Sequence, residues 1–149
     1  MKRPSVWLSR NIMGLHAYYA LCLDEASFHR ELKGLNVPRS DWPSFLSSPQ
    51  ANATCHQFET KGGNISFIVC ITAGKGVEPI QIASLLVHEA VHIWQAYCEH
   101  IGERQPSAEF EAYSIQWLSQ QLMYSFADQT KFLRQSRRAK TAAQKGEQQ

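Results

Sequence analysis

The chain lacks the short motifs that mark several common classes of protein. Its 149 residues contain no G-x-x-x-x-G-K-[ST] phosphate loop, no G-x-G-x-x-G dinucleotide motif and no G-x-S-x-G nucleophile motif. Its four cysteines form no C-x-x-C pair, and each lies in or beside an apolar run. We therefore expect reduced cysteines in the core, and nothing in the sequence demands a disulfide.

The chain also lacks long hydrophobic segments and a large excess of one charge. Met1-Lys2-Arg3 is not followed by an uninterrupted apolar region, because Ser9-Arg10-Asn11 interrupts it. No segment is long enough to span a membrane, so a cytoplasmic protein is expected. A hydrophobic content of 44% and a net charge of +2 predict one globular domain and identify no partner.

The positive charges gather at the C-terminal end. Few apolar residues accompany them, so we expect a single domain over residues 1–130 and a basic, flexible tail over residues 131–149. These cations alone do not specify a nucleic-acid partner, although a tail that binds an acidic partner is the alternative. The residues are Lys131, Arg134, Arg137, Arg138, Lys140 and Lys145.

The most informative stretch is His88-Glu89-Ala90-Val91-His92, which reads H-E-x-x-H. Residues from Ile80 to Tyr97 are mostly apolar and include no glycine or proline, which predicts a helix. Histidines four residues apart share one face of a helix, where their imidazoles can bind one tetrahedral zinc ion. Glu89 lies about 100° further round the helix, where it can act on a metal-bound water as general base.

A narrow polar strip surrounds the two histidines on this predicted helix. Four further polar side chains lie within about 40° of His88, and they are Gln81, Ser84, Gln95 and Glu99. Most other positions are apolar or alanine, so we expect a buried helix whose polar strip lines a polar site. The alternative is a buried helix whose histidines only satisfy local hydrogen bonds.

A second helix is expected after Ile101-Gly102, beginning near Pro106-Ser107 and running to about Ala127. Its first turns read Glu109-Phe110-Glu111-Ala112-Tyr113. Here the chain resembles the gluzincins, H-E-x-x-H metallopeptidases whose second motif is Glu-x-x-(Ala/Ser)-Asp. The resemblance implies that Glu109 is the third zinc ligand. It also implies that Tyr113 replaces the Asp that orients a zinc-bound histidine in the family.

Glu111 competes with Glu109 for the role of third ligand. Residues two apart on a helix point about 160° away from each other, so only one of them can face the metal. Glu109 shares its face with Gln116 and Gln120, whereas Glu111 shares its face with packing positions such as Leu118. The helical phase therefore favours Glu109. The remaining alternative is that both are solvated acids stabilised by the helix dipole.

Strands are expected upstream of the H-E-x-x-H helix. Thr54–Thr60 and Ile65–Thr72 flank a glycine-containing turn, and Leu15–Leu23 favours a strand over a helix. Asp24 predicts the N-cap of a helix over Glu25–Leu35. The expected fold is α+β, a small single domain with a short antiparallel sheet packed on the H-E-x-x-H helix and the helix that follows it. In gluzincins one strand edge holds an extended substrate, and the sequence does not identify that strand.

These motifs predict a zinc-dependent metallopeptidase that acts on a peptide or protein substrate. His88, His92 and Glu109 would hold Zn²⁺, while Glu89 would take a proton from the attacking water and pass it to the leaving amine. The whole chain also resembles small metallopeptidases encoded in phages and prophages. No side-chain specificity follows from one metal and one strand edge.

The alternative function belongs to another class. The chain would be a phage-associated structural or interaction module in which a retained zinc ion stabilises the domain. A fourth protein ligand would then close the metal site, and the candidates are His56, His100, Glu111 and Cys98.

Overall fold

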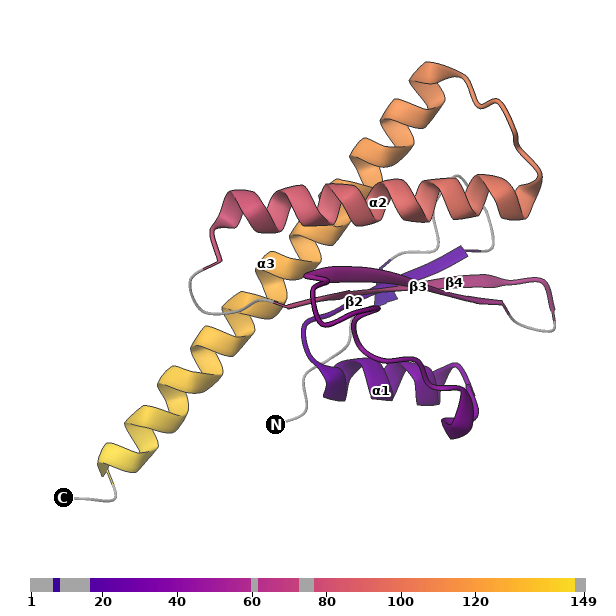
Figure 1. Ribbon diagram of the computed structural model, residues 1–149. Helices are drawn as coiled ribbons and strands as arrows, with labels where there is room; N and C mark the ends of the chain where they lie inside the picture. The colour runs from indigo at the N-terminus through magenta and orange to yellow at the C-terminus, as the bar shows by residue number, and fades with distance from the viewer. Residues whose placement is uncertain (1–6, 9–16, 60–61, 73–76, 147–149) are drawn as a thin grey trace.

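The computed structural model describes the backbone of residues 7–8, 17–59, 62–72 and 77–146, and side-chain surroundings for those between 17 and 131. Its elements run through the chain in a simple order (Figure 1). They are β1 (Trp7–Leu8), β2 (Ala17–Cys22), α1 (Glu25–Gly34), a 3-10 turn (Arg39–Asp41), β3 (Ala53–Glu59), β4 (Ile65–Ile71), α2 (Pro79–Ile101) and α3 (Ala108–Gly146).

The strands form one mixed sheet in the order β1-β2-β4-β3. β3 and β4 pair antiparallel from Ala53 opposite Ile71 to Glu59 opposite Ile65, which confirms the predicted strand pair. β2, however, lies parallel to β4. The expected antiparallel sheet is corrected on this point, because α1 and β3 lie between these strands in the chain and supply the long crossover that a parallel pair needs. β3 lies at one edge of the described sheet.

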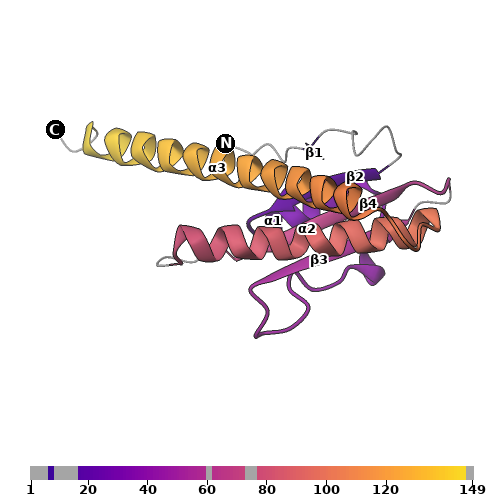
Figure 2. The ribbon, with the colours of Figure 1, turned by 90° about the horizontal axis from the view of Figure 1, so that it is seen from above.

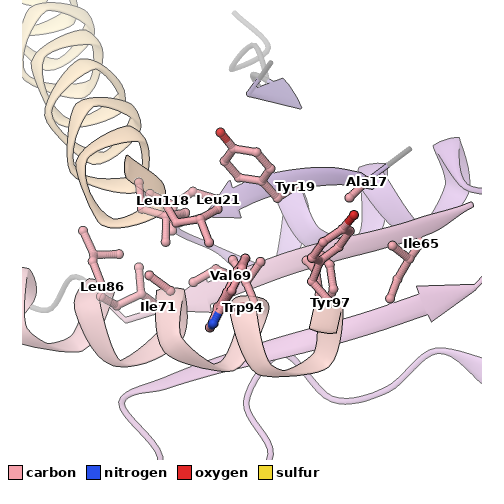
Figure 3. Close-up of a cluster of buried hydrophobic side chains, with 14 of the residues drawn as sticks. Ala17, Tyr19, Leu21, Ile65, Val69, Ile71, Leu86, Trp94, Tyr97 and Leu118 are labelled. Atoms are coloured by element: carbon pink, nitrogen blue, oxygen red, sulfur yellow. The ribbon is translucent and has the colours of Figure 1, made fainter. Parts of the chain in front are cut away.

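Helices cover both faces of the sheet (Figure 1). Side chains alternate along β4, so that Phe67, Val69 and Ile71 pack in the cluster formed with α2 and α3, while Ile68 and Cys70 pack toward α1. Figure 3 shows Val69 and Ile71 of this first cluster beside side chains of α2. Because β4 is buried on both faces, its sequence is apolar at every position except Ser66. The α+β single domain expected from the sequence is confirmed.

The two predicted capping residues, Asp24 and Gly102, lie at helix ends in the structure. Asp24 caps α1, because its side chain accepts a hydrogen bond of 2.7 Å from the backbone N–H of Ser27. α2 begins with Pro79 and a reciprocal capping box between Glu78 and Gln81. It ends at Gly102, whose φ of 73° is a left-handed conformation that favours glycine.

α3 is much longer than expected. It runs for 39 residues, from Ala108 to Gly146, and so continues through most of the segment expected to be a flexible tail. No glycine or proline interrupts it before Gly146, and lysine, arginine, glutamine and alanine all favour helix. Its C-terminal half extends beyond the sheet (Figures 1 and 2). Among the described residues no helix is long and apolar enough to cross a membrane, and the cytoplasmic location stays a prediction.

Candidate metal centre

His88 and His92 lie one turn apart on an exposed face of α2. Their Nε2 atoms are 3.0 Å apart, and their ring planes are nearly perpendicular, at 83°. Two nitrogen ligands at about 2.0–2.1 Å from a tetrahedral zinc ion lie about 3.3 Å from each other. The pair is therefore close to the separation that one zinc ion requires. A hydrogen bond between the two imidazoles accounts for the same distance when one Nε2 carries the proton.

Glu89 lies beside the histidine pair but is turned toward the sheet. It is only 3% exposed, and one of its carboxylate oxygens has no hydrogen-bond partner among the described residues. The backbone N–H of Cys55 in β3 donates a hydrogen bond to the carboxylate. Burial raises the pKa of Glu89, and the nearby His92 and His88 and the Cys55 hydrogen bond oppose this shift only in part. These are properties of a general base.

A groove with two hollows runs beside the histidines. The hollows measure about 540 Å³ and about 660 Å³, and Ala53, His88 and Glu89 line both of them. They are therefore two parts of one groove between α2 and β3. The polar strip expected from the sequence lines this groove, with Gln81 and Ser84 in the larger hollow and His92, Gln95 and Glu99 in the smaller one.

β3 contributes a wall of the site that the sequence analysis did not assign. Ala53, Cys55 and Gln57 alternate along this strand and line the smaller hollow. Burial, and secondarily the charge of Glu89, raise the pKa of the Cys55 thiol to about 12. The thiol is therefore neutral near pH 7 and is not an activated nucleophile. The alternation was visible in the sequence, but the position of β3 at the sheet edge beside α2 was not.

α3 packs on the other flank of α2. The ring of Phe110 lies 5.1 Å from that of Trp94. Trp94 points about 200° away from His92 around α2, and Figure 1 shows the first turns of α3 standing above α2, on the side of α2 away from the sheet. Glu109, in the first turn of α3, is exposed and lines neither hollow. Among the described residues, the structure therefore does not group Glu109 with His88 and His92 as ligands of one metal ion.

Tyr113 and Glu111 also lie on the α3 side. Tyr113 is 66% exposed and lines neither hollow, so the structure does not place it behind a histidine ligand. Glu111 is half-buried near Cys98. Burial raises the pKa of the Cys98 thiol, and the carboxylates of Glu103 and Glu111 add to the shift.

His56 and His100 are the two histidines that were candidates for a fourth metal ligand, and both make contacts away from the histidine pair. His56 stacks on Phe28 on the α1 face of the sheet, with 4.7 Å between ring centroids. His100 lies 3.1 Å from the carbonyl oxygen of Gly63 and 3.9 Å from the Glu59 carboxylate. Within the described residues, no group of three His, Cys, Asp or Glu side chains is arranged to hold a metal ion. Among the described residues, the histidine pair therefore offers two nitrogen atoms at an open groove.

Comparisons with protein-family models, curated proteins and solved structures give no match for this chain. The resemblance to gluzincins consequently depends on its own residues. Of the residues that carry that resemblance, the structure brings together His88, Glu89 and His92 and leaves Glu109 and Tyr113 apart.

Proposed function

We propose that this protein is a zinc-dependent hydrolase of peptide bonds, with His88 and His92 as metal ligands and Glu89 as general base. One observation carries the proposal. In an open groove, two Nε2 atoms 3.0 Å apart lie beside a buried carboxylate, one oxygen of which has no hydrogen-bond partner in the described part of the chain. Zinc bound there would supply a Lewis acid that polarises the peptide carbonyl.

Glu89 would move the proton in this reaction. Its free carboxylate oxygen accepts a proton from the water that attacks the peptide carbonyl, and the protonated acid then gives that proton to the leaving amine. The Cys55 N–H and the buried surroundings fix the carboxylate in one orientation. Because burial raises its pKa, the carboxylate is a stronger base than an exposed glutamate.

The groove leaves room for the remaining ligands. Catalytic zinc sites usually have three protein ligands and one open position. Glu109 lines neither hollow of the groove, so we propose that water and the substrate carbonyl occupy the positions that face the groove. Glu109 as third ligand stays a prediction, and comparing the metal affinity of its alanine variant with that of a histidine variant tests it directly.

The variant Glu89→Gln tests the proposed function. An amide cannot accept the proton of water, so the variant should bind zinc like the wild type and lose about 10²–10⁴-fold in kcat/KM on a fluorogenic peptide. Zinc content by elemental analysis and kcat/KM are both measured. Glu103→Gln, an exposed acid outside the groove, is the matched control and should keep full activity. A Glu89→Gln variant that cleaves as fast as the wild type would contradict the mechanism.

A zinc-stabilised structural or interaction module is the second candidate. In such a module, a zinc ion held at His88 and His92 would stabilise the domain and would not act on a substrate. In this case chelation would lower the melting temperature, yet zinc-loaded protein would cleave no peptide. The open groove at the histidine pair supports the hydrolase instead, since structural zinc sites are closed by protein ligands.

A further inference from the structure

The two parts of the groove differ in chemical character. The larger hollow lies toward the N-terminal end of α2 and includes Val77, Ile80 and Leu85 in its lining. Ile80 is 76% exposed and Val77 is 38% exposed, so large apolar side chains face solvent at the groove itself. Exposed apolar surface at a groove is typical of a binding site for an apolar group.

The smaller hollow, toward the C-terminal end of α2, is polar. Thr54, Gln57 and Gln95 line it together with Glu99, which is exposed. No lysine or arginine is among the described residues that line either hollow. Glu99 is therefore a negative charge without a cation from the groove lining, and a cationic side chain is the ligand group that complements it.

The dimensions of the groove match an extended peptide. Glu99 follows His92 by seven residues, which is about 10 Å along a helix, and an extended chain covers this distance in about three residues. β3 borders the groove over the same length, because Ala53 lies beside His88 and the Glu59 carboxylate lies 3.9 Å from His100 near the end of α2. Ile80 precedes His88 by eight residues, or about 12 Å.

We propose that the groove selects an extended peptide with two different anchors. An apolar side chain binds at Val77, Ile80 and Leu85, and a lysine or arginine side chain binds at Glu99. The histidine pair lies between these anchors, so the cleaved bond lies between the apolar residue and the cationic residue. The cationic residue is about three positions from that bond. This inference rests on the proposed hydrolase function.

The charge preference is tested with alanine-based peptides that carry one leucine and, about two to six residues away, a lysine, glutamine or glutamate. Zinc-loaded full-length protein should cleave the lysine peptide about tenfold faster, in kcat/KM, than the glutamate peptide at the best spacing. Exposed ion pairs are individually weak, so Glu99→Gln should reduce this ratio to about twofold, and Glu99→Lys should invert it. Glu103→Gln is the matched control and should keep the wild-type ratio.

The apolar anchor has its own pair of variants. Ile80→Ser should reduce the preference for leucine over serine in the peptide by about fivefold or more, because an apolar contact is lost. Ile101→Ser removes an isoleucine that is also exposed but lines neither hollow, and it should leave that preference unchanged.

The outcomes separate this inference from the proposed function. If the wild type cleaves all the peptides equally well, the two-anchor inference is overturned and the hydrolase function stands. If zinc-loaded protein cleaves none of them but binds the lysine peptide more tightly than the glutamate peptide in fluorescence anisotropy, the groove assignment stands and the hydrolase function fails. If the protein neither cleaves nor binds any of them, the two-anchor inference is overturned.

Discussion

The two flanks of α2 have different surroundings. On one flank Glu89 faces β3, an edge strand with small and polar side chains, and a groove remains open beside the histidines. On the other flank Trp94 packs against Phe110 of α3, and large apolar side chains fill the space between the helices. One flank of this helix therefore faces an open groove, and the other flank is packed. The comparison shows that nearness of two helices in sequence does not place their polar side chains in one site.

The largest expected effect lies on the packing flank. Trp94 is 1% exposed and contacts Phe110, so Trp94→Ala should lower the free energy of unfolding by about 3–5 kcal/mol. Urea denaturation of the variant and the wild type measures this difference. Val87→Ala, which changes a more exposed side chain on α2, is the control and should cost far less. A loss below about 1 kcal/mol for Trp94→Ala would mean that α3 does not pack on this flank.

The second largest effect is a difference in zinc affinity between substitutions on the two flanks of α2. His92→Ala removes one of the two proposed ligands and should weaken zinc binding by at least about 100-fold, more than the loss of an outer-shell partner normally costs. Glu109→Ala, on the far flank, should leave the affinity within about threefold. Titration against a competing chelator measures both variants. If Glu109→Ala loses zinc as severely as His92→Ala, the first turn of α3 reaches the groove and the separation of the two flanks is wrong.

The smallest effect concerns the sheet face that looks toward α1. Burial lowers the pKa of His56 from its ordinary value of 6.5, and a hydrogen bond to the Phe45 carbonyl offsets this only in part. At a pH between the lowered pKa of His56 in the folded protein and 6.5, the unfolded chain binds more protons than the folded chain does. The contribution of His56 to the free energy of unfolding should therefore be fully present above about pH 6.5. It should fall as the pH drops toward the pKa of His56 in the folded protein.

The variant His56→Phe isolates this contribution to the pH dependence. Phenylalanine keeps an aromatic ring against Phe28 but does not titrate. Unfolding free energies at about pH 7.5 and about pH 5 should differ less for the variant than for the wild type, because the other titrating groups are shared. Equal differences for the two proteins would show that His56 does not carry this part of the pH dependence.

Local patterns determined much of the fold. The 3.6-residue period predicted α2 and its polar strip, and the strip does line the groove. The turn cluster and the β-branched and aromatic residues beside it predicted the β3–β4 hairpin, while Asp24 and Gly102 predicted helix ends. Each of these features depends on residues close together in the chain, where backbone hydrogen bonds and side-chain period fix the structure.

The tertiary structure alone decided where these elements meet. A helical phase places Glu109 and Glu111 on opposite sides of α3, but it does not say on which flank of α2 that helix packs. The contact between Trp94 and Phe110 decided that question, because burying large rings outweighs the position of exposed carboxylates. In the same way, the parallel pairing of β2 with β4 put β3 at the edge of the sheet. The sequence by itself therefore determined His88, Glu89 and His92 as a unit, whereas long-range packing decided which strand forms the other wall of the groove.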